Sequence, residues 1–140
     1  MASKIFLDAN VLLDFFFKRP AYEESKQIIA LAVNNKVQAF ITPSVVHIVG
    51  HWLTKAFGAV LAKELLLTLL ADVQVIDITH EIALFALHSK IDDIEDALQY
   101  YTAKHHNVDF FISLDKRLQK NSISSLPVYT PKEFIKEFSL

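Results

Sequence analysis

Cysteine is absent from the 140-residue chain, which excludes disulfide bonds, thiolate-bound zinc and a cysteine nucleophile. Glycine and proline are scarce, with 2 and 4 residues, whereas 52% of the residues are hydrophobic. This composition argues against a disordered linker and predicts a helix-rich folded chain. The length is typical of one domain, so we expect a single domain over residues 1–140.

Long hydrophobic runs are also absent. The most apolar segment, residues 57–71, carries Lys63 and Glu64 in its middle and is shorter than the roughly 20 apolar residues that cross a bilayer. No cationic segment precedes an apolar stretch at the N-terminus, so the sequence predicts no signal peptide. We therefore expect a soluble, cytoplasmic protein with no membrane partner.

Excess positive charge is missing too, since the formal net charge is −2. A polyanion such as nucleic acid would have to be held by local basic residues or by a metal ion. The candidate basic residues are Lys18, Arg19, Lys116, Arg117 and Lys120. Phe15, Phe16, Phe17 and Trp52 could stack on bases, although a place in the core or in a dimer interface is the more common role of such side chains.

Short apolar runs alternate with helical patterns along the chain. Strands are predicted over residues 4–8, 37–41, 73–78, 109–113 and 127–129, and helices over residues 10–17, 21–34, 43–57, 59–71, 79–89, 93–105 and 131–137. Because the strands are almost continuously apolar, they predict a mainly parallel sheet of about four to five strands with both faces covered. The expected fold class is α/β, a three-layer α/β/α sandwich.

Acidic residues stand where such a sheet would gather them. Asp8 ends the first strand, Asp115 follows the fourth, and Asp96 lies in the first turn of a helix with Asp92 and Asp93 just before it. The carboxyl ends of parallel strands meet at one edge of the sheet. Carboxylates are the oxygen ligands that Mg²⁺ and Mn²⁺ prefer, so the three positions predict a divalent cation site.

Most of these acids also have purely structural explanations. Asp92 or Asp93 could be the N-cap of the helix, with Glu95 and Asp96 as first-turn acids stabilised by the helix dipole. Asp115 could likewise cap a short helix.

The N-terminal acids differ from the others in this respect. Asp8 lacks such an explanation, because a carboxylate that ends an apolar strand needs hydrogen bonds or a cation to offset desolvation. Asp14, on the helical turn that follows, could support the ligands or be an exposed acid.

The run from Phe6 to Asp14, F-L-D-A-N-V-L-L-D, resembles the opening motif of the PIN domain, the nuclease fold of many bacterial toxin–antitoxin toxins. Residues 94–100 (I-E-D-A-L-Q-Y) and 111–115 (F-I-S-L-D) resemble its third and fourth acidic motifs, in the same order. Residues 18–20, 36–42 and 127–134 resemble the branch of the family whose third motif is of the D-F-E-D-A-L-Q type. The resemblance covers nearly the whole chain.

The resemblance implies a metal-dependent endoribonuclease that hydrolyses phosphodiester bonds of single-stranded RNA with Mg²⁺ or Mn²⁺. It also implies the toxin of a toxin–antitoxin pair, with an antitoxin protein as a partner, and a homodimer. The implied catalytic residues and metal ligands are Asp8, Asp96 and Asp115, with Asp93 or Glu95 as a supporting acid and Asn10 and Ser113 as the residues that orient the ligands.

The second motif departs from the family pattern. PIN nucleases commonly carry a glutamate on the helix after the second strand, where this chain has His47, or Ile48 under a one-residue shift. His47 could face the acidic residues as a supporting polar group, or it could be a partly buried histidine. His47 and His51 are spaced as in zinc sites, but the sequence shows no third ligand. A weakly active or inactive PIN-like module that binds RNA or a protein is therefore the alternative.

Two other α/β folds with acidic pockets fit less well. A haloacid-dehalogenase-like phosphatase needs a second aspartate two residues after its nucleophile, where this chain has Asn10. A phosphotransfer receiver needs an aspartate at the end of the third strand, and the strand pattern around Asp77 continues into Ile78.

Overall fold

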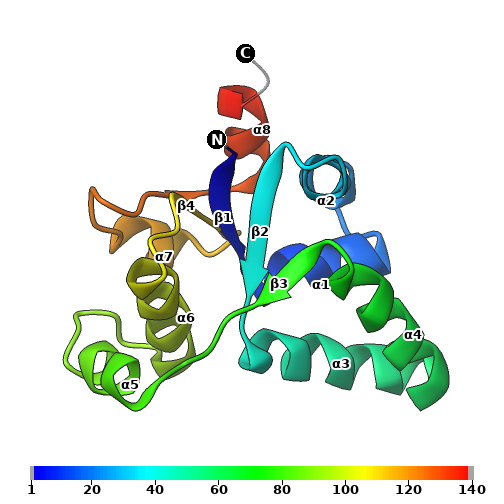
Figure 1. The fold of residues 1–140 in the computed structure, drawn as a ribbon, viewed down its shortest axis with the longest axis horizontal. Coiled ribbons are helices and arrows are strands. Elements are labelled where there is room, and N and C mark those ends of the chain that lie inside the picture. Colours follow the sequence, from blue (N-terminus) through cyan, green and yellow to red (C-terminus); the bar gives the residue numbers. More distant parts are fainter. Residues whose placement is uncertain (1, 139–140) are drawn as a thin grey trace.

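Five parallel strands form the centre of the molecule, in the order β3-β2-β1-β4-β5 (Figure 1). The computed structural model describes residues 2–138. The strands are β1 (Ser3–Leu7), β2 (Val37–Ile41), β3 (Val73–Val75), β4 (Phe110–Ile112) and β5 (Val128–Tyr129). The predicted parallel sheet is confirmed, and all of its pairings are parallel.

Helices cover both faces of this sheet. Within residues 2–138 they are α1 (Ala9–Phe17), α2 (Tyr22–Val33), α3 (Pro43–Phe57), α4 (Ala59–Leu70), α5 (His80–Leu87), α6 (Ile94–His105), α7 (Lys116–Lys120) and α8 (Pro131–Phe138). In Figure 1, α1 to α4 lie on one side of the sheet and α5 to α7 on the other, while α8 packs against α2. This confirms the predicted three-layer α/β/α fold. None of the described helices has the length and hydrophobicity required to cross a membrane.

The order of the strands places β1 between β2 and β4. The chain moves outward from β1 to β2 and β3, and then returns across the sheet to form β4 on the other side of β1. The direction of winding therefore reverses between β1 and β4. In open α/β sheets, ligands bind at such a reversal, beyond the carboxyl ends of the two strands.

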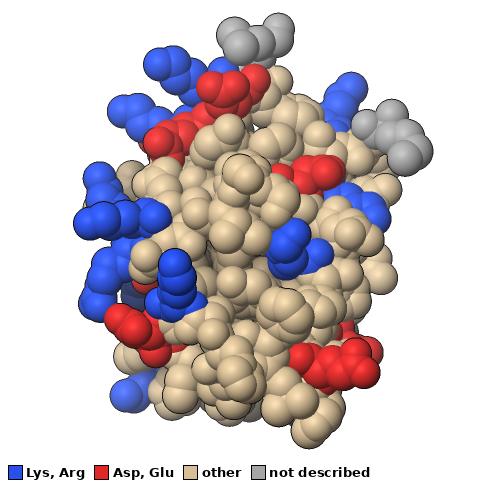
Figure 2. All heavy atoms as spheres, turned by 90° about the vertical axis from the view of Figure 1, so that its left-hand side faces the viewer, with Lys and Arg blue, Asp and Glu red and all other residues tan. Residues whose placement is uncertain are grey.

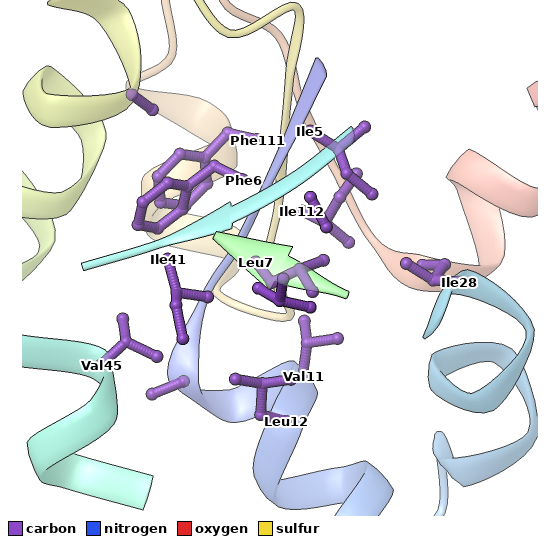
Figure 3. Close-up of a cluster of buried hydrophobic side chains, with 14 of the residues drawn as sticks. Ile5, Phe6, Leu7, Val11, Leu12, Ile28, Ile41, Val45, Phe111 and Ile112 are labelled. Atoms are coloured by element: carbon purple, nitrogen blue, oxygen red, sulfur yellow. The ribbon is translucent and has the colours of Figure 1, made fainter. Parts of the chain in front are cut away.

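Aromatic and aliphatic side chains fill opposite faces of the two central strands. Phe6 and Phe111 are paired neighbours whose rings stack 4.8 Å apart, and Tyr100 of α6 packs on Phe111. Figure 3 shows Leu7 and Ile112 on the other face, toward α1. All five side chains have 0% of their surface exposed. The last residue of β1 and the last residue of β4 are therefore anchored by the core.

Strand β3 is shorter than the sequence pattern predicts. The predicted strand 73–78 ends at Val75 in the structure, and Ile76 makes one more backbone hydrogen bond, to the carbonyl of Ile41. Strand β2 ends at Ile41 because Pro43 begins α3, so the chain beyond Ile76 has no strand to pair with. Residues 73–78 do have the β-branched pattern of a strand, but β2, the strand with which they pair, ends before they do.

Replacing Phe111 with alanine tests the anchoring of the central strands. The substitution removes a fully buried ring, and we expect it to lower the free energy of unfolding by about 3 to 5 kcal/mol. Phe57→Ala is the control because 47% of Phe57 is exposed, and it should cost less. Urea unfolding followed by circular dichroism measures both values, and equal losses would contradict this account of the core.

Candidate active site

Asp8 lies at the point where β1 becomes α1. Its backbone N–H donates to the carbonyl of Ile112 over 3.0 Å, so the pairing of β1 with β4 extends one residue past the strand. Its side chain is the N-cap of α1, with Oδ1 2.7 Å from the backbone nitrogen of Ala9. Only 8% of Asp8 is exposed. The two connections give a buried carboxylate one defined orientation.

Ser113 is the hydrogen-bonding centre of the site. Its hydroxyl donates to Oδ2 of Asp8 over 2.7 Å and accepts from the backbone N–H of Asp115 over 3.0 Å. Nδ2 of Asn10 lies 3.3 Å from the same hydroxyl and 3.4 Å from Oδ2 of Asp8, and Oδ1 of Asn10 accepts from the backbone N–H of Leu114. The structure thus brings Asn10 and Ser113 onto Asp8, where the family resemblance places them.

Helix α6 delivers the second group of acids. Asp93 is its N-cap, because Oδ1 accepts from the backbone N–H of Asp96 over 2.9 Å, and Glu95 and Asp96 occupy the first turn. The structural explanation foreseen for Asp93 is therefore correct. The same first turn brings Asp96 close to the acids that follow the strands, Asp8 and Asp115.

Asp115 combines a structural contact with a place in the site. It is the N-cap of α7, with Oδ1 accepting from the backbone N–H groups of Arg117 and Leu118 over 2.9 and 3.2 Å. Together with Asp93, Asp96 and Arg117 it lines a small hollow of about 90 Å³. A hollow of this size has room for several water molecules. It lies between the start of α6 and α7, and Asp8 is not among the residues that line it.

Burial and mutual repulsion make the central carboxylates weak acids. Burial raises the pKa of Asp8 to about 6, with smaller contributions from Asp115 and Glu95, against the opposing hydrogen bonds from Ser113 and the Ala9 N–H. Burial raises the pKa of Asp96 to about 7, assisted by the charges of Asp8, Asp93 and Asp115 and by a hydrogen bond to Asp115. Asp8, Asp96 and Asp115 therefore share one electrostatic environment, although they are far apart in sequence.

Such an environment suits a cation. In the part of the chain that the structure describes, no three carboxylate, histidine or cysteine side chains converge to the geometry of a complete metal site. The donors nevertheless fit a hard divalent ion, because a cation would offset the burial and the smaller mutual repulsion that raise the pKa values of Asp8 and Asp96. The chemistry of the donor set is consistent with Mg²⁺ or Mn²⁺.

Sequence reasoning assigned no role to Gln99, which the structure places at the edge of the site. Thr42, the N-cap of α3, donates its hydroxyl hydrogen to Oε1 of Gln99, which lies one turn after Asp96 on α6. Gln99 is 2% exposed, and its Nε2 has no partner among the described residues. This bond joins the start of α3 to the helix that carries Asp96. Only the I-E-D-A-L-Q-Y motif gave a signal for this residue.

His47 does not face the acidic residues as predicted. It is exposed on α3 and lines a separate surface hollow between α3 and α4, together with His51. Four residues after Pro43, the helix has turned this position away from the sheet edge, whereas Val45 and Val49 face the core. The prediction of His47 as a supporting polar group is corrected here, and no acid of α3 takes its place, since this helix contains none.

The remaining acids lie around this group. Asp14 is buried on α1, one turn after Asn10, and burial raises its pKa against the opposing charge of Arg19. Asp92 is exposed and lines the same hollow as Asp96. Asp77 is exposed beyond the edge strand β3, outside the reversal point of the sheet. Asp77 therefore lacks the central position that a phosphotransfer receiver requires.

A PIN domain family model matches residues 4–117. The chain belongs to the PIN domain family. The match contains all four motif regions, including the second, in which this PIN domain has no acid. Among curated proteins, none matches the sequence.

Solved structures share the fold of this PIN domain at low sequence identity. VapBC2 from Rickettsia felis, bound to a DNA fragment from its promoter, has a TM-score of 0.71 at 15% identity, covering 91% of this chain and 98% of that chain. A toxin–antitoxin complex from Klebsiella pneumoniae has a TM-score of 0.68 at 23% identity, with 91% and 97% covered. VapC20 of Mycobacterium tuberculosis, a sarcin–ricin loop cleaving toxin, has a TM-score of 0.67 at 13% identity, with 86% and 97% covered.

The raised pKa values predict how the stability of the metal-free PIN domain depends on pH. Asp8 and Asp96 titrate at about 6 and about 7 in the folded chain, against 3.8 ordinarily, so the folded chain binds more protons than the unfolded chain in this range. Stability should therefore fall as the pH rises from about 4 to about 7. Asp96→Asn should raise Tm by several degrees at about pH 8 and much less at about pH 5.

Thermal unfolding in the presence of EDTA measures this difference. Asp72→Asn is the control, because Asp72 is an exposed carboxylate in the turn between α4 and β3. An equal stabilisation by Asp96→Asn at both pH values would show that the effect has another origin.

Proposed function

We propose that this PIN domain protein is a divalent-cation-dependent endoribonuclease that cleaves single-stranded RNA, and that it acts in the cytoplasm as the toxin of a toxin–antitoxin pair. The observation that carries the proposal is the shared electrostatic environment of Asp8, Asp96 and Asp115 at the reversal point of the sheet. Buried acids that lie close together, with pKa values raised by burial and by one another's charge, are typical of a functional site.

Family membership and structural similarity support this reading. One similar structure is a toxin that cleaves the sarcin–ricin loop, and two are toxin–antitoxin complexes. We infer an antitoxin partner for this chain by analogy. The open reading frame next to its gene is the place where a small DNA-binding antitoxin should be encoded, and co-expression with that product should suppress RNA cleavage.

Asp8, Asp96 and Asp115 would hold the Mg²⁺ or Mn²⁺ ion. When bound, the ion supplies a Lewis acid that stabilises charge on the phosphate and lowers the pKa of a water molecule. Ser113 and Asn10 keep Oδ2 of Asp8 in place, and Asp93 holds the first turn of α6 so that Asp96 faces the strand ends. Glu95 adds negative charge near Asp8, and burial, together with Asp93, raises the pKa of Glu95.

Basic residues next to the hollow would bind the phosphates of the substrate. Arg117 lines the hollow, and Lys116 and Lys120 stand on the same short helix, α7. Figure 2 looks at the face of the molecule that lies on the left of Figure 1, and it shows basic side chains gathered along one side with acidic side chains beside them. This local charge offsets a net charge that by itself would repel RNA.

A second candidate function is a PIN-like module that binds RNA or a protein without cleaving it. The observation that favours it is the second motif, where α3 contributes no acid and His47 points elsewhere. With three acids in place of four, the site has one negative charge fewer and should hold a metal ion more weakly. Binding without cleavage is the outcome that would select this candidate.

Cleavage assays separate the two candidates. We expect the purified protein to cleave single-stranded RNA in Mg²⁺ or Mn²⁺ and to lose activity in EDTA. Asp8→Asn and Asp96→Asn should each reduce the cleavage rate by at least about 100-fold, because each removes a charged donor from the site. The measurement is the initial rate on a labelled oligonucleotide.

The controls for this assay distinguish a loss of catalysis from a loss of folding, and cleavage by this protein from cleavage by a contaminating nuclease. Asp72→Asn should retain full activity, and both site variants should keep the circular dichroism spectrum of the parent protein. Mn²⁺ should raise the Tm of the parent protein at pH 8 but not that of the Asp96→Asn variant. Cleavage at the same rate by the parent and both site variants would reject the nuclease assignment.

Exposed apolar side chains suit the homodimer that the family resemblance implies. Leu84, Phe85 and Leu87 of α5 are exposed by 48%, 60% and 61%, and the first two line a hollow of about 700 Å³ between α5 and α6. Apolar groups gathered on one helix favour association with a protein surface. We infer that α5 pairs with a second copy of the chain.

Sedimentation velocity tests this pairing. The parent protein should sediment as a dimer, and Phe85→Ser with Leu87→Ser should shift it toward the monomer. Val60→Ser is the matched control, since Val60 is an apolar residue of α4 that is 76% exposed. A parent protein that is monomeric at high micromolar concentration would overturn the inference.

A further inference from the structure

Helices α3 and α4 enclose a groove whose charge is opposite to that of the active site. The groove has a volume of about 510 Å³ and is lined by His47, His51 and Lys55 from α3 and by Lys63 from α4. None of the described residues that line it is acidic. In a chain with a net charge of −2, this is a local concentration of groups that attract anions.

The basic residues of α3 form a line along the helix. His47, His51 and Lys55 follow one another at intervals of four residues, so they share one face of α3 and extend over about 12 Å. Lys63 stands on the opposite wall. A line of this kind fits the regularly spaced phosphates of an extended strand better than it fits a single small anion.

Close packing of the two helices forms the floor of this groove. Gly50 of α3 lies against Leu66 of α4, since a Cβ at this position would stand 3.3 Å from Cδ1 of Leu66. Gly58 joins the two helices with a φ of 85°, a backbone conformation that other residues rarely adopt. The walls of the groove are therefore set by backbone geometry and not by mobile side chains alone.

An aromatic ring accompanies the basic line. Trp52 is 44% exposed, with Nζ of Lys55 5.5 Å from its ring centroid and the His51 ring 5.3 Å from it. Exposed aromatic faces beside basic groups are the combination with which proteins hold single-stranded nucleic acid, because bases stack on the ring while phosphates meet the cations. Trp52 is therefore next to two residues that line the groove, His51 and Lys55.

The first turn of α3 connects the helix that carries the groove to the helix that carries Asp96. Thr42, which caps α3, is hydrogen bonded to Gln99 one turn after Asp96, and His47 lies five residues further along α3. In Figure 1, α3 begins below the carboxyl ends of the strands and runs away from them toward α4. No acidic side chain of α3 adds negative charge to this face of the helix.

We propose that the groove between α3 and α4 holds the segment of single-stranded RNA that leads away from the active site, with Lys55 and Lys63 on phosphates and Trp52 stacked on a base. The proposal rests on the ribonuclease function proposed above and adds the path of the substrate. In this proposal, the groove contributes to RNA affinity although it lies about two helical turns or more from the acidic residues. Short RNA that reaches only the acids should not use it.

RNA binding by the Asp8→Asn protein tests the path without cleavage. Fluorescence anisotropy is measured with labelled single-stranded RNA of 6 and 20 nucleotides over a range of salt concentrations. Lys55→Gln with Lys63→Gln should weaken binding of the long RNA on the order of tenfold at low salt, and should reduce the slope of log K against log salt by about 1.4, or about 0.7 for each lost phosphate contact. Trp52→Ala should weaken binding with little change in slope.

The matched control is Lys26→Gln with Lys36→Gln, which makes the same change in net charge at exposed positions on α2 and in the turn that follows it. This control should bind like the Asp8→Asn parent. Equal losses in the groove and control variants, or no loss in the groove variant, would overturn the proposal. A change in sedimentation with unchanged RNA affinity would show that the groove instead holds a second copy of the chain or another protein, which also overturns it.

Cleavage assays with the groove variant in a protein that retains Asp8 show which proposal is wrong, the RNA path or the nuclease function. If the groove variant cleaves long RNA with an unchanged KM while Asp96→Asn is inactive, the nuclease assignment stands and the groove proposal is wrong. If neither RNA is cleaved or bound by any form of the protein, both proposals fail. A raised KM for long RNA alone, with kcat unchanged, is the expected result.

Discussion

The pairing of β1 with β4 is the constraint on which the rest of the site depends. It places Asp8 opposite Ser113, so that one backbone hydrogen bond and one side-chain hydrogen bond hold a buried carboxylate between two central strands. The stacked rings of Phe6 and Phe111 fix the register just before this point. Because a shift of one residue would move every side chain to the other face, the core and the site depend on the same alignment.

The site concentrates charge that the fold must tolerate. Three carboxylates from β1, α6 and α7 share one region, and two of them have pKa values raised to about 6 and about 7. N-caps reconcile this with a stable fold, since Asp8, Asp93 and Asp115 each satisfy backbone N–H groups at the start of a helix. Capping therefore does not exclude these residues from the acidic group. The same side chains perform the structural task and create the acidic environment.

The missing acid of the second motif changes the character of α3. This helix contributes no negative charge to the site, and its exposed face carries histidine and lysine beside the groove with α4. The protein thus combines a compact acidic site with a separate basic surface on a helix that begins beside α6. For a polyanionic substrate, the first would serve the reacting phosphate and the second the rest of the strand.

The sequence by itself determined the elements and the residues most suited to chemistry. Strands and helices follow from local periodicity, Asp8 stands out because an apolar strand cannot end in an unsatisfied carboxylate, and Thr42 and Asp93 are recognisable as caps. Only the tertiary structure decided which side chains meet. The end of β3 depends on where β2 stops, His47 is turned away from the acids by its place on α3, and Gln99 reaches Thr42 from a distant helix. Periodicity is a local property, whereas strand register and helix rotation depend on contacts between segments that the pattern of any one segment does not contain.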